Sequence, residues 1–275
     1  MPLLLLPAAL LVCVMMMAPM VLLFRYSLNL YSPTQLMVEA LSPANYLNAV
    51  RDPYYRDVLG TTLWVALLCT LLALEAGFPA GYALARMRGR WKAWLTLLTI
   101  FPLMVGNVVR AAGWMTLLGN TGMLNAALRG LGLVGEPVQI MYTTGAVVIG
   151  IVTVVLPYMI LTLASVIESI PRSVEEAAAN MGARPFTVFR RVVFPLSLPG
   201  VVAGSALVFI LCMNAYATPV LLGGSQFKMM APAVYDQFVR TTNWPFGAAL
   251  AFILLFVTLG LTMAGSALLQ RRYRG

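Results

Sequence analysis

Glu176-Ala177-Ala178-Ala179-Asn180-Met181-Gly182, followed by Val192-Val193-Phe194-Pro195, is the stretch around which this chain is organised. It lies in a polar loop, residues 168–196, between apolar segments near 141–167 and 197–222. The alanines predict a narrow helix surface that another protein can approach closely, and Gly182 suits the left-handed position that ends a helix. We therefore expect a membrane protein that docks onto a partner through this loop.

The same loop carries signals for the start of its helix. Ser173 is the expected N-cap, with Glu176 three residues later as its capping-box partner. Glu175 and Glu176 would then lie in the first turn, where the helix dipole favours negative charge. A second short helix, about 185–193, is expected to lead to Pro195. An ordinary capped loop helix with no docking role is the alternative interpretation.

Composition excludes a soluble domain. The chain has 275 residues, of which 61% are hydrophobic and 10% are charged, whereas soluble domains carry roughly 25% charged residues. Backbone groups inside lipid must be paired within the protein, which leaves helix bundles or closed barrels. The apolar runs are ~20 residues long and lack the alternation of barrel strands. An all-α membrane protein is predicted.

Six apolar segments are long enough to cross a bilayer. They lie near 3–24, 58–84, 93–117, 141–167, 197–222 and 246–269. The first has no basic residue before it, so we expect a retained span rather than a cleaved signal. The predicted division is a first span with an outer segment, 1–57, and a core domain, 58–275.

Basic residues predict the orientation of these spans. With the N-terminus inside, the inner segments hold Arg86, Arg88, Arg90, Lys92, Arg172, Arg184, Arg190, Arg191, Arg271, Arg272 and Arg274. The outer segments hold Arg25, Arg51, Arg56, Arg129, Lys228 and Arg240. The positive-inside rule therefore places both termini and loop 168–196 in the cytoplasm. The net charge of +9 needs no nucleic-acid partner, because it anchors the chain to the bilayer.

Several kinds of site lack the residues they need. The sequence has no histidine, and its cysteines, Cys13, Cys69 and Cys212, lie in separate apolar runs. No catalytic site and no metal site are predicted. The only lysines, Lys92 and Lys228, do not follow glycine, so the phosphate-binding loop G-x-x-x-x-G-K-[ST] is missing.

The motif resembles the EAA loop of binding-protein-dependent ABC importer permeases. That pattern is EAA, three residues, Gly, nine residues, Ile, one residue and Leu-Pro; this chain keeps the spacing with Val192 for Ile and Phe194 for Leu. The resemblance implies a type I importer fold with six transmembrane helices and a coupling helix. It also implies that the ATPase contact is made by Glu176, Ala177, Ala178, Gly182 and Pro195.

The resemblance implies a set of partners in the bacterial inner membrane. These are two copies of an ATP-binding subunit, which would hold ATP and Mg²⁺, a second permease of a different sequence, and a periplasmic solute-binding protein. This chain would hold no cofactor and would be no enzyme. Further stretches are similar to the first permease subunit of spermidine/putrescine importers: Val109-Arg110, Gly122-Met123-Leu124-Asn125, Leu222-Gly223-Gly224, Asp236-Gln237-Phe238 and Trp244-Pro245-Phe246-Gly247-Ala248-Ala249.

Polar residues inside the spans are candidates for the solute path. An ionisable group there is costly and is a functional candidate by default. Glu75 lies in the second span; Arg110 lies in the third, on one face with Asn107 and Trp114. The alternatives are that Glu75 and Arg110 pair with neighbours, or that Arg110 reaches the outer surface.

An aromatic and amide patch completes the candidate path. Asn214 and Tyr216 lie in the fifth span and Tyr158 in the fourth; such groups suit an organic cation through cation–π contact, although they also bond neighbouring helices. The expected function is ATP-driven import of a small solute, a polyamine-like cation being favoured. The scarcity of carboxylates leaves open an organophosphonate, an amino-acid derivative or another anion. An ion-coupled secondary transporter is the rival class.

Overall fold

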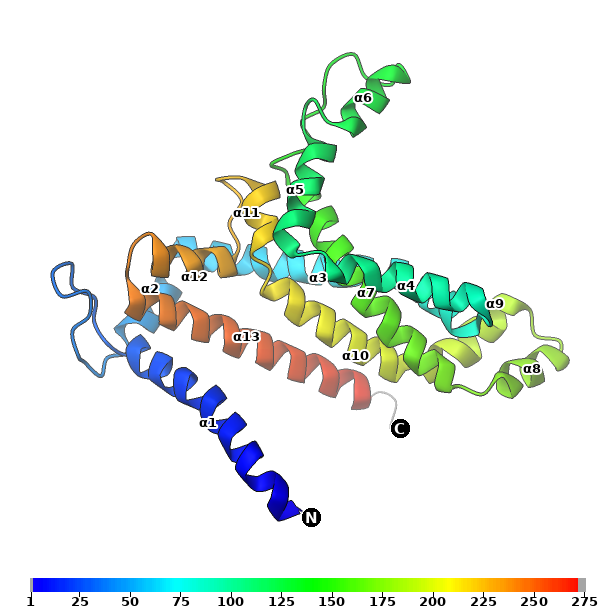
Figure 1. Ribbon diagram of the computed structural model, residues 1–275, viewed down its shortest axis with the longest axis horizontal. Helices are drawn as coiled ribbons and strands as arrows, with labels where there is room; N and C mark the ends of the chain where they lie inside the picture. The colour runs from blue at the N-terminus through cyan, green and yellow to red at the C-terminus, as the bar shows by residue number, and fades with distance from the viewer. Residues whose placement is uncertain (1, 272–275) are drawn as a thin grey trace. The chain divides into compact units, whose positions relative to one another are not determined.

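The computed structural model describes residues 2–271, and the side chains of residues 10–267. Within this range the chain is helical and has no β-strand (Figure 1). A single antiparallel bridge joins Leu30 and Val38 in the segment after the first helix. The predicted all-α architecture is confirmed.

The helices follow one another with short connections. Their bounds are α1 (Pro2–Ser27), α2 (Ala44–Arg51), α3 (Pro53–Arg86), α4 (Arg90–Met104), α5 (Asn107–Leu118), α6 (Met123–Gly130), α7 (Thr144–Ser169), α8 (Arg172–Asn180), α9 (Pro185–Val188), the π-helical turn η1 (Phe189–Val193), α10 (Phe194–Met213), α11 (Ala217–Gly223), α12 (Met230–Val239) and α13 (Trp244–Arg271). In the described range, five continuous helical runs are long and apolar enough to cross a membrane: Leu10–Ser27, Pro53–Arg86, Thr144–Ser169, Pro185–Met213 and Trp244–Ala267.

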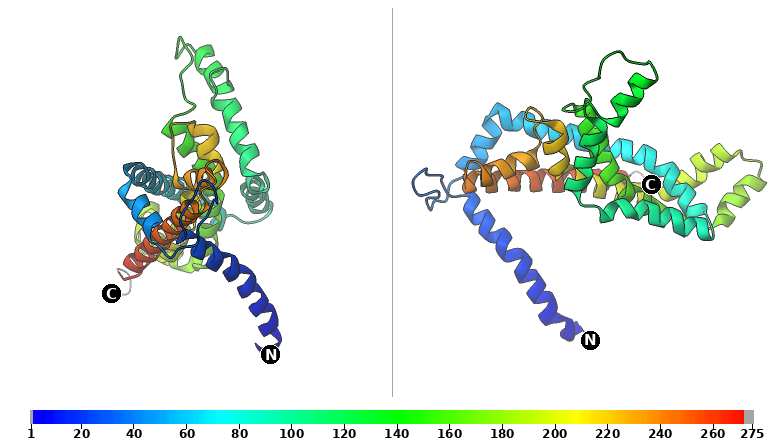
Figure 2. Two further views of the ribbon diagram at one scale, coloured as in Figure 1. Left: turned by 90° about the vertical axis from the view of Figure 1, so that its left-hand side faces the viewer. Right: turned by 45° about the horizontal axis from the view of Figure 1, so that its top comes forward.

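The expected third span, 93–117, is not one straight helix. α4 ends at Met104 and the next helical run starts at Asn107, with a bend of 96° between them (Figure 2). Val105 and Gly106 are both extended. The break has a tertiary cause: the Arg110 side chain bonds the carbonyls at the end of α4, so those acceptors are satisfied without a continuing helix. Counted as one bent span, this pair completes the predicted six.

The expected fifth span, 197–222, also ends early. α10 stops at Met213, and the Asn214 side chain donates to the carbonyl of Ile210 at 2.9 Å. α11 begins at Ala217 with Pro219 in its first turn. Proline is tolerated there, but in a continuous helix its ring would clash with the carbonyl four residues earlier. The composition of the segment predicted its apolar character but not this interruption.

The chain divides into two compact units. One comprises Met1–Gly60 and Met229–Thr258, and the other comprises Thr61–Lys228 and Leu259–Gly275. α3 and α13 each contribute residues to both units. The predicted division at residue 57 remains a prediction.

In the larger unit, α7 is the central helix. It packs along α10 and also contacts α4, α5 and α11. Small residues allow this: a Cβ at Gly81 of α3 would lie 3.0 Å from the Leu163 Cβ, and one at Gly200 of α10 would lie 2.9 Å from the Val166 Cβ. Inside a bilayer, helix association excludes no water, so the hydrophobic effect does not drive it. Glycines let the backbones approach closely, and the resulting van der Waals contact stabilises the pair.

In the smaller unit, side-chain contacts join α1 to α2 and α13, and α12 to the start of α3. The Asn45 side chain donates to the carbonyls of Ser27 and Asn29, each at 2.8 Å. Phe24 and Phe252 stack edge to face with centroids 5.2 Å apart. The Gln237 amide donates to the Tyr55 hydroxyl at 3.0 Å. Two of these contacts join helices that are distant in sequence, and Asn45 fixes the start of the segment 28–43.

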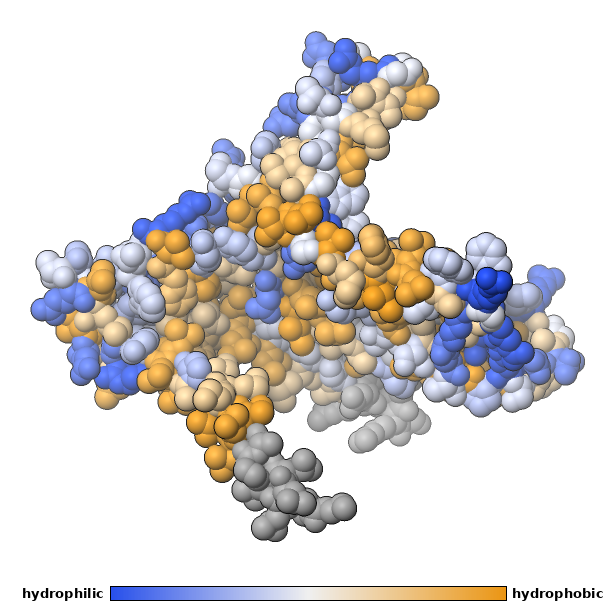
Figure 3. Space-filling view, viewed as in Figure 1, coloured by the Kyte–Doolittle hydropathy of each residue, from blue (hydrophilic) through white to orange (hydrophobic). Residues whose placement is uncertain are grey.

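α4 presents apolar side chains outward. It has no buried residue, and its Trp94, Leu98 and Phe101 are each about two-thirds exposed. Figure 3 shows apolar side chains along α4, with hydrophilic side chains gathered near its first turn and α8. An apolar surface of this extent has to face lipid or another apolar surface.

Candidate functional site

α8 begins two residues earlier than a Ser173 N-cap would allow. Pro171 precedes the helix, no side chain caps it, and Ser173 lies inside the first turn. The Pro171 carbonyl accepts from the amide of Val174 at 3.2 Å and closes that turn. The predicted capping box is therefore wrong, because proline with an extended ψ of 133° already sets the boundary. Glu175 lies in the first turn as predicted, but Glu176, which was also expected there, lies beyond it because the helix starts earlier.

The end of α8 agrees with the prediction for Gly182. Its φ is +83°, in the left-handed region that favours glycine. The Gly182 amide bonds the Ala179 carbonyl at 2.9 Å, and the Ala183 amide bonds the Ala178 carbonyl at 3.2 Å. This pair of bonds is the Schellman arrangement, which satisfies the last carbonyls of a helix.

The residues between these ends form an open surface. α8 has no buried residue; Glu176 and Ala177 are exposed, and Ala178 is half-buried. Pro195 is exposed in the first turn of α10. The second helix predicted at 185–193 is present as α9 and η1. The five predicted coupling residues thus lie on α8, in the turn that ends it, and in the first turn of α10.

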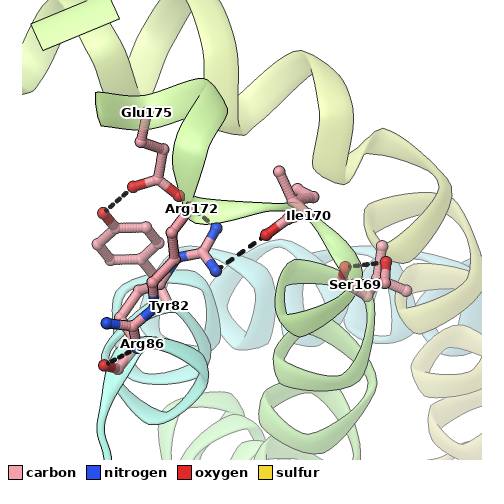
Figure 4. A network of polar contacts seen from close by, with 7 residues as sticks. Tyr82, Arg86, Ser169, Ile170, Arg172 and Glu175 are labelled. Atoms are coloured by element: carbon pink, nitrogen blue, oxygen red, sulfur yellow. Dashed lines mark hydrogen bonds and ion pairs between the residues drawn. The ribbon is translucent and has the colours of Figure 1, made fainter. Parts of the chain in front are cut away.

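Glu175 points the other way and joins α8 to the end of α3 (Figure 4). Its Oε1 pairs with Arg86, and its Oε2 accepts a hydrogen bond from the Tyr82 hydroxyl at 2.9 Å. Arg86 also donates to the carbonyl of Ile170 at 3.2 Å, and Arg172 donates to the carbonyl of Arg86. Sequence reasoning missed this network. Adjacent helix residues point about 100° apart, so Glu175 and Glu176 cannot both lie on the same face of α8. Their adjacency in the sequence could therefore have indicated that one carboxylate faces its own chain.

Five of the seven predicted path residues line one cavity of about 310 Å³ in the larger unit. Asn107 and Arg110 come from α5, Tyr158 from α7, and Asn214 and Tyr216 from the break between α10 and α11. Thr218, which the sequence groups with Asn214 and Tyr216, also lines the cavity. Sequence reasoning did not single out the aliphatic wall of Leu103, Ile151, Val154, Val155 and Leu211. The two interruptions that the sequence did not predict thus create the polar part of this cavity.

Arg110 is the charged residue of the cavity lining. Its Nη2 donates to the carbonyls of Pro102 and Val105, the latter at 2.9 Å. Its Nε and Nη1 are buried and have no hydrogen-bond partner among the described residues. Buried donors without partners are costly, so this guanidinium can offer two hydrogen bonds to a further group.

Trp114 and Glu75, the other two candidates, lie outside this cavity. The Trp114 indole donates to the Thr153 hydroxyl at 3.1 Å and ties α5 to α7. Glu75 is exposed on α3 and lines a separate groove of about 530 Å³. Aromatic rings dominate that groove: Phe78, Tyr82, Phe186, Phe189 and Phe194. Glu75 makes no hydrogen bond or ion pair within the described part of the chain.

Comparisons with known proteins agree with this geometry. The spermidine/putrescine transport system permease protein PotB of Haemophilus influenzae is 33% identical over 230 residues, covering 84% of this chain and 78% of that protein. PotB of Escherichia coli is 35% identical over 212 residues, 77% of each chain. A crystal structure of a bacterial alginate ABC transporter with a pentasaccharide-bound periplasmic protein contains a chain of the same fold. Its TM-score is 0.77 at 14% identity, covering 98% of this chain and 93% of that one.

The match to a family extends over most of the larger unit and beyond. Residues 77–275 match the binding-protein-dependent transport system inner membrane component. This range contains α8, both interrupted helices and the cavity that they line. The chain belongs to this family of inner-membrane transport components.

Proposed function

We propose that this chain is one permease subunit of an ATP-driven importer and that α8 is its coupling helix. The observation that carries the proposal is the exposed α8 surface, which has Glu176 and Ala177 outward and a glycine-terminated end. A helix with no buried residue gains little from its own chain, so a partner is the natural source of its stability. The family supports the assignment, because its members are components of binding-protein-dependent transport systems.

The proposed assembly supplies what this chain lacks. One of two ATP-binding subunits, each with its ATP and Mg²⁺, would dock on α8, and a second, different permease would complete the path. A periplasmic binding protein would deliver the solute. The exposed apolar surface of α4 supports burial against lipid or the second permease. The chain itself would be no enzyme: it provides the path and the lever.

The proposed location is the bacterial inner membrane, with both termini and α8 in the cytoplasm. Basic residues gather at the α8 end of the larger unit: Arg86, Arg88, Arg90, Lys92, Arg172, Arg184, Arg190 and Arg191. An excess of Lys and Arg marks the cytoplasmic side of a membrane protein. The two terminal arginines, Arg272 and Arg274, lie outside the described residues.

A small organic cation of the polyamine class is the proposed solute. Two relatives at 33% and 35% identity are named spermidine/putrescine permeases. The Glu75 groove supports the same class, because it combines a carboxylate without a partner and several aromatic faces. Ammonium groups are attracted both to carboxylates and to the faces of aromatic rings. In this proposal the solute passes the polar cavity and then Glu75 as the subunits alternate between outward and inward access.

A second candidate solute is an anion, such as an organophosphonate or an amino-acid derivative. The observation that favours it is Arg110, which lines a cavity that carries no carboxylate and has two nitrogens without hydrogen-bond partners among the described residues. A guanidinium suits carboxylate and phosphonate groups, since it presents paired donors in a fixed plane. The two candidates therefore predict different sensitive residues.

The complete complex, reconstituted with its binding protein, separates the candidates. ATPase activity and uptake are measured with putrescine, spermidine, a small phosphonate and an amino-acid derivative. If a polyamine is the solute, Glu75→Gln lowers its uptake about tenfold, a typical loss for one charged contact. Stimulation by an anion alone, with Arg110→Gln as the sensitive variant, would overturn the polyamine proposal. Failure of any ATPase subunit to co-purify would overturn the importer proposal.

A further inference from the structure

The two neighbouring glutamates of α8 face different partners. Glu176 is exposed, whereas the Glu175 and Arg86 side chains of the ion pair are only 16% and 14% exposed. Both Glu175 oxygens are taken by α3, one by Arg86 and the other by Tyr82. The motif residue Glu176 is thus left for docking, and Glu175 is committed to the interior of its own chain.

The connection between α8 and α3 is reciprocal. Arg86 reaches past Glu175 to the Ile170 carbonyl, just before α8, while Arg172 at the start of α8 reaches back to the Arg86 carbonyl. Each charge also complements a helix end: Glu175 lies in the first turn of α8, and Arg86 lies in the last turn of α3. We call Arg86, Glu175, Tyr82 and Arg172 the clasp.

Polar side chains make the direct connection between α8 and α3. α8 buries no residue, and its neighbours in the chain are α7 on one side and α9 on the other. Residues Arg86 and Glu175 are 89 positions apart, so no short covalent path connects their helices. The nearest apolar contact involves η1, where Phe189 stacks on Phe78 at 5.3 Å and on Tyr82 at 6.2 Å. Displacement of α8 can therefore reach α3 directly through the clasp and indirectly through η1, which contacts α8 and stacks on α3.

We propose that the clasp transmits displacement of α8 to α3 and that Arg86 and Glu175 are the positioning residues of coupling. The inference rests on the proposed function, in which α8 docks on an ATPase subunit. α3 carries Glu75 and packs by Gly77 and Gly81 on α7, which lines the polar cavity. A movement imposed on α8 therefore reaches both candidate solute sites through one helix.

The pair is suited to this task because it is largely shielded from solvent. Exposed ion pairs contribute little and yield easily, whereas removing one partner of a shielded pair leaves an uncompensated charge. Lys92–Glu168 provides the contrast: it joins the first turn of α4 to α7 on the same side of the unit, but its side chains are 36% and 40% exposed. It is a matched control for an ion pair outside the clasp.

The first test uses the full complex with its binding protein in proteoliposomes, with labelled putrescine as the probe. Glu175→Gln should retain the ATPase subunit on purification, because the α8 surface is unchanged. Solute moved per ATP hydrolysed should fall about tenfold, within the usual range of coupling between sites. Arg86→Glu combined with Glu175→Arg should recover part of this loss, whereas Glu168→Gln should couple as the wild type does.

A second readout does not depend on the solute. Ala76 is exposed on α3 next to Glu75, and Ala76→Cys is made in a background without Cys13, Cys69 and Cys212. ATP with vanadate should change the maleimide-labelling rate of this cysteine, and Glu175→Gln should remove the change. An ATP-induced change that survives Glu175→Gln, with coupling also unaltered, overturns the clasp while leaving the importer standing. Loss of the ATPase subunit from the Glu175→Gln complex would also overturn it, by showing a purely structural role.

Discussion

Arg110 donates through its Nη2 to the carbonyl of Pro102, eight residues earlier, across the bend between α4 and α5. The same nitrogen reaches the Val105 carbonyl at 2.9 Å. Both carbonyls lie at the end of α4, where a terminated helix supplies few donors; the Val105 amide also donates to the Pro102 carbonyl at 3.3 Å. A positive charge at a helix C-terminus also interacts favourably with the negative end of the helix dipole. Arg110 is therefore a structural part of the bend as well as a wall of the polar cavity.

Arg110→Met is expected to weaken the bend. The variant keeps the length of the side chain but removes the side-chain donor from two partly buried carbonyls, of which that of Pro102 keeps the Val105 amide, at a cost of about 1–3 kcal/mol. The midpoint of thermal unfolding of the purified complex should fall by several degrees, and uptake should fall with it. Arg129→Met, at an exposed arginine in the last turn of α6, should unfold as the wild type does. Wild-type stability with uptake alone lost would instead assign the guanidinium to the solute.

Gly150→Ala should disturb the packing of α7 against α11. An added Cβ would lie 2.6 Å from the Leu222 Cδ1 and 2.6 Å from the Thr218 Cγ2, and both side chains are buried. Overpacking of this kind costs about 1–3 kcal/mol, and it displaces Thr218 in the cavity wall. The measurement is the thermal unfolding midpoint in detergent.

Gly113→Ala is the control for Gly150→Ala. Gly113 is also helical, but nothing lies within 4 Å of its Cβ position. Alanine should leave stability unchanged or raise it by about 0.5–1 kcal/mol through its higher helix propensity. Equal destabilisation by both substitutions would mean that close approach of α11 is not what requires glycine at position 150.

Local signals in the sequence predicted the helices and the end of α8. Gly182 could be assigned to a left-handed position because the Schellman bonds involve only neighbouring residues, from Ala178 to Ala183. The breaks after Met104 and Met213 were missed, since apolar composition continues across both. Arg110 stabilises the first break by reaching back over the bend, a contact that span-length hydropathy cannot represent.

The sequence predicted residues of the candidate site but not which of them lie together. Seven polar residues were treated as one path, yet Glu75 lies in an aromatic groove apart from the cavity of Arg110. Helical periodicity places residues on a face, but which faces meet depends on contacts between α5, α7 and the break after α10. The Arg86–Glu175 pair was missed for the same reason, because its partners are 89 residues apart.

Asn125→Ala should loosen the segment between α5 and α7. Asn125 is 1% exposed; its amide donates to the carbonyls of Gly119 and Val138 at 3.1 and 3.0 Å, and its Oδ1 accepts from the Val138 amide at 2.9 Å. Loss of these bonds removes the side-chain partners of the Val138 amide and carbonyl and one of two donors to the Gly119 carbonyl, at about 1–3 kcal/mol. Limited proteolysis should cut residues 126–138 faster than in the wild type. Asn48→Ala, at an exposed helical asparagine, should show no change; equal cleavage of wild type and Asn125→Ala would contradict the prediction.

Ala177→Asp and Gly182→Asp are expected to keep membrane insertion and lose uptake. The first places a charge on the surface proposed to meet the ATPase, where desolvation and steric conflict oppose docking. The second also forces a side chain into a φ of +83°. Uptake in a complementation assay should fall by at least about tenfold, with co-purification of the ATPase subunit reduced in parallel.

The two positions fail for different reasons, and conservative variants separate them. Ala177→Ser adds one small hydroxyl and should retain most uptake, because the helix surface stays narrow. Gly182→Asn should be milder than Gly182→Val, since asparagine tolerates the left-handed conformation and a β-branched residue does not. The space around Gly182 is open within its own chain, so backbone conformation and the partner surface are the remaining constraints. Normal uptake by both aspartate variants would show that α8 is not the coupling helix.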